Sequence, residues 1–319
     1  MKTPMHVVLG ASGATGRAVV NALLIKNLPC KAVGRSKINP AVETVNANLL
    51  DPLQVKKVLE NATHVYVCVG LPYQSEVWLR DWPLLMKYVI AACAEYDVKI
   101  IFFDDIYMYG PAPLDVPFDE NHQQNPTTKK GIARKHTADL LLKALQENKV
   151  QGVIGRSADF YGPYAVNSPF YIYFLERMLK GQAPIFMTKT NVPHTYANAI
   201  DNANALVALA LDPRTYGEVW HLPVGPPVTL EQVMNVINKE LKTNFKAKFL
   251  PGIVRNVSKF FISSLKEVDE MLYQFNNEYV MSFDKFQKHF PEFLVTPYDQ
   301  GIKAMINSFQ ESPTTASLS

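Results

Sequence analysis

The stretch Gly10-Ala11-Ser12-Gly13-Ala14-Thr15-Gly16 constrains the fold of this chain more than any other. It follows an apolar run at residues 5–9 and opens an apolar-periodic segment at 17–27, which predicts a strand, a glycine-rich turn and a helix. Glycine allows a tight turn and a close approach of backbone N–H groups to a pyrophosphate at the positive end of the helix dipole. The alternative is a strand–helix turn without a ligand. We expect a dinucleotide-binding loop with contacts from Gly10, Ser12, Gly13, Ala14, Thr15 and Gly16.

Composition narrows the class of protein. The 319 residues are 48% hydrophobic, enough for a sizeable core in one large domain or two small ones. A net charge of +3 does not indicate binding to nucleic acid or a membrane surface. No apolar run has the length of a membrane span and the N-terminus lacks a signal-peptide pattern, so a cytoplasmic protein is predicted. The three cysteines lack CxxC or CxxH spacing, and no metal site is expected.

Strand-like and helix-like segments alternate through the first half of the chain. Strands are predicted at residues 31–34, 42–47, 64–70, 99–103 and 152–155, with helices at 51–61, 82–96 and 128–148. This alternation predicts an α/β fold, a Rossmann-type doubly wound parallel sheet with a smaller C-terminal substrate-binding lobe. We expect residues 1–157, completed by about 193–222, to form the cofactor-binding domain. Residues 158–319, mainly 158–192 and 223–310, are expected to form the lobe.

The end of the second predicted strand bears on the choice of cofactor. An NAD site usually has an acidic residue about 20 residues after the glycine loop, bonded to the ribose 2′-hydroxyl. This chain has Gly34-Arg35-Ser36-Lys37 there, with no carboxylate. Arg35 suits a 2′-phosphate, with Ser36 beside it and Arg17 nearby. NADP(H) is therefore preferred and NAD(H) remains open, the alternative being that the two cations form a solvated turn.

Two further segments follow predicted strands. Leu50 and Asp51 come after the third strand, where an adenine contact is plausible, although Asp51 is also the expected N-cap of the next helix. Gly70 ends the fourth strand, where a glycine lets the backbone pass close to a ribose. All three belong to the expected cofactor site.

These residues resemble the extended branch of the short-chain dehydrogenase/reductase superfamily, which includes the NAD-dependent epimerase/dehydratase family. Gly10, Gly13 and Gly16 have that branch's G-x-x-G-x-x-G spacing. Residues 109–111 are similar to its V-Y-G-P segment, and residues 155–163 to its R-P-x-N-x-Y-G-P segment. Residues 196–205 are similar to a late D-D-V-A-x-A segment. The resemblance covers roughly residues 5–310 and implies a nicotinamide cofactor and a small-molecule substrate, in a monomer or homodimer.

The catalytic motif of that branch is incomplete here. The family has Tyr-x-x-x-Lys on the helix after the fifth strand, where the lysine lowers the pKa of the tyrosine and binds the nicotinamide ribose. This chain supplies Lys135, but Gly131 stands at the tyrosine position. The family's upstream hydroxyl residue falls on Asp105, and the asparagine of R-P-x-N is Asp159. The chain thus looks like an atypical member of the branch.

Replacements for the missing acid are expected beyond the fifth strand. Tyr107 is the first candidate, with Asp105 tuning a proton relay and Lys135 holding the ribose. Alternation along an extended segment would place Asp105, Tyr107 and Tyr109 on one side. The alternatives are a packed aromatic turn and a solvated helix lysine. The expected substrate contacts are Tyr109, Asp159 and Arg156.

Several charged residues have two interpretations. Arg134 and Arg156 suit an anionic substrate group, or an ion pair with Asp159 or Asp139. His194 is either a substrate contact or a hydrogen-bonded structural histidine, and a helix-stabilising role is expected for Asp201.

The sequence supports an NADP(H)-dependent oxidoreductase or an epimerase/dehydratase-like enzyme that acts on a small carbonyl or hydroxyl substrate. The missing tyrosine motivates an alternative, a catalytically silent NADP(H)-binding regulator or sensor. A nucleotide-sugar epimerase is a third interpretation, but it requires a diphosphate clamp. The second half of the chain offers only scattered cations for one, such as Arg177, Lys180, Arg214 and Arg255.

Overall fold

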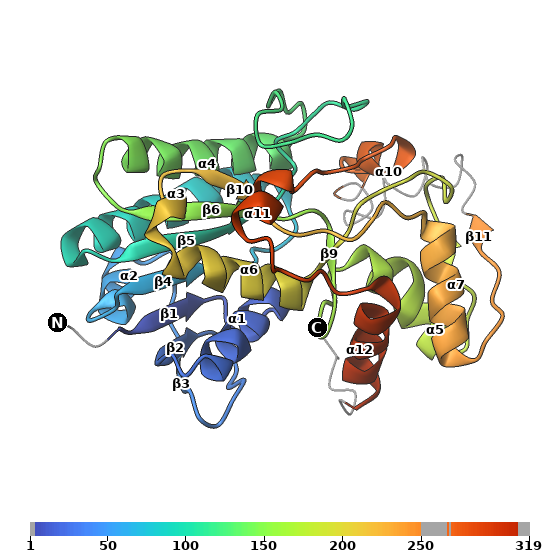
Figure 1. The fold of residues 1–319 in the computed structure, drawn as a ribbon, viewed down its shortest axis with the longest axis horizontal. Coiled ribbons are helices and arrows are strands. Elements are labelled where there is room, and N and C mark those ends of the chain that lie inside the picture. The colour runs from blue at the N-terminus through green and yellow to red at the C-terminus, as the bar shows by residue number, and fades with distance from the viewer. Residues whose placement is uncertain (1–3, 250–266, 268, 312–319) are drawn as a thin grey trace.

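A computed structural model describes residues 4–249, 267 and 269–311, and its centre is a parallel sheet (Figure 1). Within these residues the sheet has seven strands in the order β10-β6-β5-β4-β1-β2-β3. Every neighbouring pair is parallel. The strands are β1 (His6–Leu9), β2 (Cys30–Val33), β3 (Glu43–Val45), β4 (His64–Val67), β5 (Lys99–Asp104), β6 (Gly152–Arg156) and β10 (Val219–His221). The doubly wound α/β fold predicted from the alternation is confirmed.

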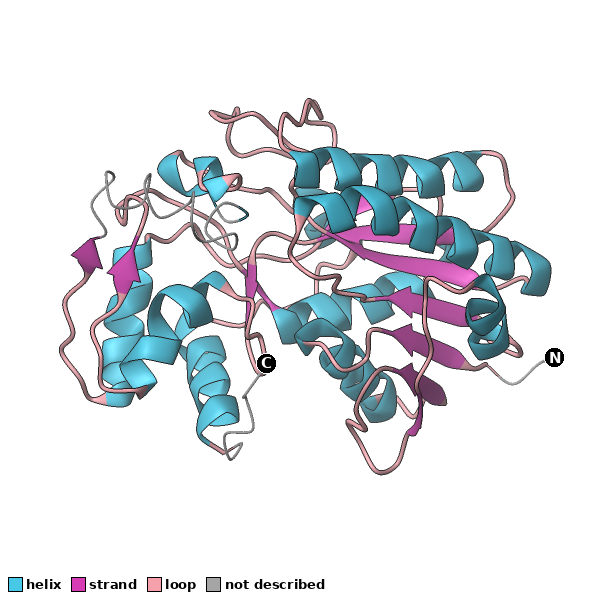
Figure 2. Ribbon diagram, turned by 180° about the vertical axis from the view of Figure 1, so that it is seen from behind, coloured by secondary structure: helices cyan, strands magenta, loops and turns pink. Residues whose placement is uncertain are grey.

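Helices cover both faces of this sheet, and alternate strand residues point to the two layers (Figures 1 and 2). Val7, Val65 and Ile100 pack against the helices of one layer, and Val8, Tyr66 and Ile101 face the other. The first layer has α2 (Pro52–Leu59), α3 (Ser75–Tyr96) and α4 (Lys129–Gln146). The second has α1 (Ala14–Ile25), α6 (Ala199–Leu211) and α11 (Asp284–His289). The central strands β1, β4, β5 and β6 are largely buried on both faces, as parallel strands are, whereas the edge strand β3 is not.

The remaining elements gather at the end of the molecule away from the N-terminus (Figure 1). Their aromatic core includes Phe170, Phe174, Phe186 and Tyr196, with aliphatic residues of α7 and α12. The elements there include the π-helix η1 (Tyr171–Leu175), α5 (Glu176–Leu179), α7 (Leu230–Leu241), α10 (Tyr273–Asn276) and α12 (Tyr298–Gln310). Two short parallel pairs are β7 (Phe160–Tyr161) with β9 (Ala197–Asn198), and β8 (Ile185–Phe186) with β11 (Lys248–Phe249). A 3-10 turn, η2 (Pro213–Thr215), precedes β10.

Local chemistry sets several helix boundaries. The carboxylate of Asp51 accepts hydrogen bonds from the backbone N–H groups of Leu53 (2.9 Å) and Gln54 (3.4 Å), so its predicted N-cap role is confirmed. Helix α3 begins at Ser75, earlier than expected, because it continues through Pro83. None of the described helices is both long and apolar enough to pass through a bilayer.

Candidate functional site

The glycine loop lies at the carboxyl end of β1, where the strand order reverses between β1 and β4. Gly10 has φ +77°, and a Cβ on it would overlap the backbone of Cys68 and Val69. A Cβ on Gly16 would lie 2.8 Å from the Cα of Ala11. Both glycines are therefore required by packing. A Cβ on Gly13 would meet only the carbonyl oxygen of Gly10, at 3.5 Å, so the space over Gly13 is open.

The first turn of α1 has donors that the helix leaves unused. Gly13 is the N-cap, and no side chain caps this end. The first backbone bond of the helix runs from the N–H of Arg17 to the carbonyl of Gly13, so the amides of Ala14, Thr15 and Gly16 have no intrahelical acceptor. The hydroxyl of Thr15 is buried and has no hydrogen-bond partner in the described structure. These donors fit a phosphate group at the helix N-terminus.

Hydrogen bonds join the glycine loop to the turn after β2. The Oγ of Ser12 accepts from the backbone N–H of Ser36 at 3.3 Å and lies 3.3 Å from the Oγ of Ser36. A Cβ on Gly34 would overlap the side chain of Ser12, so the two segments are in direct contact. The Nε of Arg17 donates to the carbonyl of Ser12, and its guanidinium lies 5.0 Å from the ring centroid of Tyr164.

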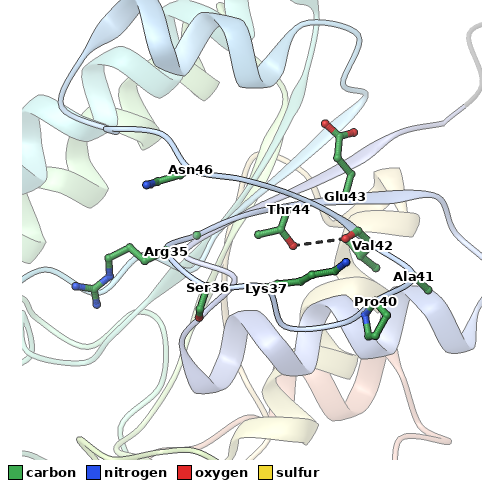
Figure 3. A pocket seen from close by; sticks show the side chains of 10 residues that line it. Arg35, Ser36, Lys37, Pro40, Ala41, Val42, Glu43, Thr44 and Asn46 are labelled. Atoms are coloured by element: carbon green, nitrogen blue, oxygen red, sulfur yellow. Dashed lines mark hydrogen bonds between the residues drawn. The ribbon is translucent and has the colours of Figure 1, made fainter. Parts of the chain in front are cut away.

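A pocket of about 410 Å³ opens beside this turn (Figure 3). Arg35, Ser36 and Lys37 form one side, and all three are exposed. Thr44 and Asn46 of the neighbouring segment line the other side, together with Glu43. The carboxylate of Glu43 lies 3.8 Å from the Nζ of Lys31. Arg35 stands at the end of β2 between Gly34 and Ser36, which contact Ser12 of the glycine loop, and in Figure 3 its side chain points away from Thr44.

The other expected cofactor residues follow β3 and β4. Asp51 is engaged as the α2 N-cap, and its second oxygen accepts from the amide Nε2 of Gln54 at 2.8 Å. Leu50 is half-buried directly before it. Gly70 is exposed, with open space where a Cβ would stand. A cofactor role for these residues stays a prediction.

A buried charge network lies under the carboxyl end of β5 and β6. The guanidinium of Arg134 donates to Asp104 Oδ1 at 2.6 and 3.0 Å, and the Nε of Arg156 donates to Asp104 Oδ2 at 3.2 Å. Arg156 also donates to the hydroxyl of Tyr109 at 2.7 Å, and this hydroxyl contacts the Nε2 of His221 at 2.7 Å. Burial, assisted by Arg156, lowers the pKa of His221 to about 3, so this ring is neutral.

This network corrects two expected substrate contacts. Arg156 and Tyr109 are both completely buried, and they bind each other rather than an open site. The charge of Arg156 is needed to compensate Asp104 in the interior. The predicted alternation that would place Asp105, Tyr107 and Tyr109 on one side is also wrong. Residues 106–109 form a turn closed by a hydrogen bond from the N–H of Tyr109 to the carbonyl of Ile106.

Asp105 and Tyr107 remain next to each other at the sheet edge. Asp105 Oδ2 lies 3.0 Å from the Nε of Arg134, and Asp105 Oδ1 accepts from the backbone N–H of Tyr107 at 3.0 Å. Burial raises the pKa of Asp105 to about 7 against the pull of Arg134, and the Asp104 carboxylate adds to the rise. The ring of Tyr107 stacks on Trp78 with centroids 5.9 Å apart. Burial holds the pKa of Tyr107 well above its usual range, so this hydroxyl keeps its proton.

The sequence motif indicated that Lys135 of helix α4 faces the site, but two other cations of this helix face the interior. Lys135 lies on the exposed side of α4, where its Nζ donates to Asp139 at 2.7 Å. A role of Lys135 at a cofactor ribose stays a prediction. Lys130 and Arg134, also four residues apart, face the interior. Gly131 is buried against the backbone of Tyr107.

Lys130 forms ion pairs with Glu267 and Glu270, which were not among the predicted site residues. Its ammonium has no exposure and donates to Glu267, to Glu270 Oε2 at 2.9 Å and to the hydroxyl of Ser75 at 3.0 Å. The Oγ of Ser75 lies 2.6 Å from Glu267 Oε2 and 2.7 Å from Glu270 Oε2, so its single proton can bond either carboxylate. The signal that could have indicated this inner face is the Lys130-x-x-x-Arg134 spacing.

Asp159 and His194 meet beyond the end of β6. The Nε2 of His194 lies 3.2 Å from Asp159 Oδ2, although the two atoms are not aligned as a hydrogen bond. The side chain of Asp159 retains 11% exposure and that of His194 only 3%. Asp201 accepts from the backbone N–H and the hydroxyl of Thr296 at 2.8 and 2.7 Å, consistent with its expected structural role. No group of three His, Cys, Asp or Glu side chains among the described residues is placed to hold a metal ion.

Comparison with known proteins gives this geometry a context. The model of the NAD dependent epimerase/dehydratase family matches residues 6–222. None of the curated proteins matches the chain.

Solved structures give the same fold at low identity. The UDP-glucose 4-epimerase of Thermotoga maritima, solved with UDP-glucose, has a TM-score of 0.80 at 16% identity, covering 96% of this chain and 98% of that one. The UDP-glucose 4-epimerase of Thermus thermophilus, solved with NAD, has a TM-score of 0.77 at 18% identity, covering 97% and 100%. A dTDP-glucose 4,6-dehydratase of Streptomyces venezuelae has a TM-score of 0.79 at 12% identity, covering 96% and 97%.

Proposed function

Because this chain belongs to the NAD-dependent epimerase/dehydratase family, we propose that it is an NADP(H)-dependent oxidoreductase or epimerase/dehydratase-like enzyme. Its substrate is a small carbonyl or hydroxyl compound, held at the carboxyl edge of the sheet under the lobe of residues 158–192 and 223–310. One observation carries the proposal. The space over Gly13 is open, and the hydroxyl of Thr15 in the first turn of α1 is buried without a partner among the described residues, so the loop fits a pyrophosphate.

The preference for NADP(H) rests on the pocket beside Arg35. Arg35 and Lys37 are exposed there, and a guanidinium can bind a 2′-phosphate through two parallel hydrogen bonds. Glu43 is the carboxylate of the pocket lining, and Lys31 lies close enough to offset its charge. Ser12 and Ser36 hold this turn against the glycine loop, so one dinucleotide can reach both.

The proton chemistry is assigned to Asp105. A nicotinamide bound at this edge supplies or accepts the hydride. Asp105, with a pKa of about 7, can hold or release a proton near neutral pH, and Arg134 orients its carboxyl group. Tyr107 keeps its proton and donates a hydrogen bond to a substrate oxygen. Lys135 is left out of this proposal because its side chain pairs with Asp139 on the exposed side of α4.

Calorimetric titration with NADPH and NADH tests the cofactor assignment. We expect Arg35→Ala to lose about 1.5–3 kcal/mol of NADPH affinity and to bind NADH almost unchanged, because only the 2′-phosphate contact is removed. Lys26→Ala is the matched control, since Lys26 is exposed at the other end of α1. Equal losses for both cofactors would contradict the NADP(H) assignment, and no binding of either would contradict the function.

A silent NADP(H)-binding sensor is the second candidate. The observation that favours it is the absence of room at Gly131 for the family's tyrosine. Oxidation of NADPH by a panel of aldehydes and ketones separates the two candidates. Turnover that Asp105→Asn abolishes supports the enzyme, whereas NADPH binding without turnover supports the sensor.

A further inference from the structure

Arg17 occupies a position that is unfavourable for a cation unless an anion lies nearby. Helix α1 begins at Ala14 and has no acidic residue in its first turn, so nothing in the helix compensates the positive end of its dipole. Arg17 folds back toward this end, because its Nε donates to the carbonyl of Ser12 at 3.1 Å. The side chain is half-buried, and no carboxylate among the described residues pairs with it. A bound anion would offset both the guanidinium and the helix dipole.

Two contacts orient the guanidinium of Arg17 and leave its outer nitrogens available. The Nε is bonded to Ser12, and the Cζ lies 5.0 Å from the ring centroid of Tyr164, which is a cation–π distance. The two terminal nitrogens have no hydrogen-bond acceptor within the part of the chain that the structure describes. A guanidinium held in this way can bind two oxygen atoms of a phosphate through parallel hydrogen bonds.

Tyr164 is held in a conformation that a bulky residue rarely adopts. Its φ is +60°, in the left-handed region. Its N–H donates to the Oγ of Ser308 in α12 at 3.1 Å, and its carbonyl accepts from the N–H of Val166 at 3.0 Å. The residue is 45% exposed, so core packing does not explain a tyrosine at this position. Backbone strain of this kind is concentrated at functional positions, and the ring of Tyr164 contacts Arg17.

The contact joins two parts of the molecule beside the glycine loop. Arg17 belongs to α1 of the sheet domain, whereas Tyr164 and Ser308 belong to the lobe. The open space over Gly13 and the unused amides of the first turn lie at the same end of α1. An exposed cation–π pair is weak by itself, so it does not explain a cation at this helix end. A phosphate bound to Arg17 would neutralise the cation and give the Tyr164 contact a role in binding.

We infer that Arg17 is a phosphate-binding residue of the cofactor site and that Tyr164 is the positioning residue that holds its guanidinium beside the glycine loop. The pyrophosphate and the 2′-phosphate of NADPH present the same chemistry to Arg17, because Ser12, its hydrogen-bond partner, joins the glycine loop to Ser36. Tyr164 and Ser308 link the bound phosphate to the lobe. This inference rests on the proposed function and adds a contact from the lobe to its cofactor site.

The experiment measures NADPH and NADH affinity by calorimetry for Arg17→Met, Tyr164→Ala, Tyr164→Phe and the double variant Arg17→Met/Tyr164→Ala. We expect Arg17→Met to weaken NADPH binding about tenfold or more, because a charged hydrogen bond to phosphate is lost. Tyr164→Ala should weaken it about twofold to fivefold through the loss of the cation–π contact. Tyr164→Phe keeps the ring and should bind normally. Val166→Ala, 48% exposed on the same loop, is the matched control and should also bind normally.

The double variant separates a positioning role from a merely structural one. If Tyr164 acts through Arg17, Tyr164→Ala has no further effect on NADPH affinity once Arg17 is methionine. A loss of the same size in both backgrounds would overturn the positioning role, as would a Tyr164→Phe variant that binds as weakly as Tyr164→Ala. Circular dichroism confirms that each variant is folded before its affinity is compared.

The two cofactors identify the phosphate. A loss for NADPH alone on Arg17→Met assigns the 2′-phosphate, and equal losses for NADPH and NADH assign the pyrophosphate. Normal binding of both cofactors by Arg17→Met overturns the inference and leaves the proposed function intact. Absence of NADPH and NADH binding by the natural protein, which is measured first, contradicts the proposed function and this inference with it.

Discussion

The backbone carbonyl of Tyr107 occupies the place where a Cβ on Gly131 would lie. The same Cβ would lie only 2.8 Å from the Cβ of Pro126 and from the Oγ1 of Thr128. Helix α4 thus approaches the turn after β5 more closely than any residue except glycine permits. The family's tyrosine position has been closed by packing, and the hydroxyl groups near the sheet edge come from other segments.

Gly131→Ala is expected to destabilise the fold. Alanine in a free helix position is favoured over glycine by roughly 0.5–1 kcal/mol, but the overlap with the Tyr107 carbonyl should cost about 2–4 kcal/mol net. Urea unfolding monitored by circular dichroism measures the change. Gly70→Ala is the control, because open space surrounds that position. A stabilised Gly131→Ala variant would contradict the close packing.

The glycines of the loop should separate into ligand-facing and structural positions. Gly13→Ala meets no close atom, so we expect the free energy of unfolding to change by about 1 kcal/mol or less, with a loss of NADPH affinity of tenfold or more. Gly16→Ala would overlap the backbone of Gly10 and Ala11, so both stability and affinity should fall. Calorimetry and thermal unfolding of the two variants measure these quantities. Normal NADPH binding by Gly13→Ala would exclude a pyrophosphate at this loop.

Lys130 and Lys129 provide an internally matched pair. Lys130→Met leaves the carboxylates of Glu267 and Glu270 partly buried without their cation, so a loss of about 3–5 kcal/mol in the free energy of unfolding is expected. Lys129 pairs with Glu76 at the surface, and Lys129→Met should cost about 1 kcal/mol or less. Urea titration of both variants tests the difference. Similar small losses would show that the Lys130 cluster adds no net stability.

The raised pKa of Asp105 predicts that the free energy of unfolding changes with pH in a defined direction. Its pKa rises from the ordinary value of 3.8 to about 7 in the fold, so the native state retains a proton that the unfolded chain releases. The corresponding stabilisation is fully present below about pH 4 and is lost as the pH rises through about 7. The Asp105→Asn variant has no carboxyl group at this position, so its stability lacks this pH-dependent contribution.

We therefore expect the stability of Asp105→Asn, relative to the natural protein, to increase by on the order of 2–4 kcal/mol between about pH 4 and about pH 8. Urea unfolding across this range measures the difference, and Asp139→Asn serves as the exposed control. A difference that stays constant or shrinks with rising pH is the contrary result.

Local sequence patterns were sufficient to predict the central sheet and its first helix boundaries. The glycine spacing, the apolar strands and the Asp51 cap each depend on residues that are neighbours in the chain, and each was predicted correctly. Helix α7 lies in the expected lobe, where no helix was predicted. Its signal was present, because Thr229 and Gln232 form a capping box before an apolar-periodic run.

The site could be predicted only in part. The sequence placed Arg134 and Asp159 among the candidates, but it could not show that Arg134 is neutralised by Asp104 and Asp105. It favoured Lys135 because of a four-residue spacing, whereas the rotation of α4 turns Lys130 and Arg134 inward. Helix rotation depends on how the whole apolar face packs, and a single pair of residues does not set it.

The sequence by itself determined the parallel α/β sheet and the glycine loop, because hydrophobic periodicity and glycine's backbone freedom act over a few adjacent residues. Only the tertiary structure decided which charges are free to meet a ligand. Arg156 and Lys130 find their carboxylates on segments far away in the chain, and burial makes those pairings obligatory. Among the described residues, the ion-pair partner of Asp159 is His194, which also comes from a distant segment.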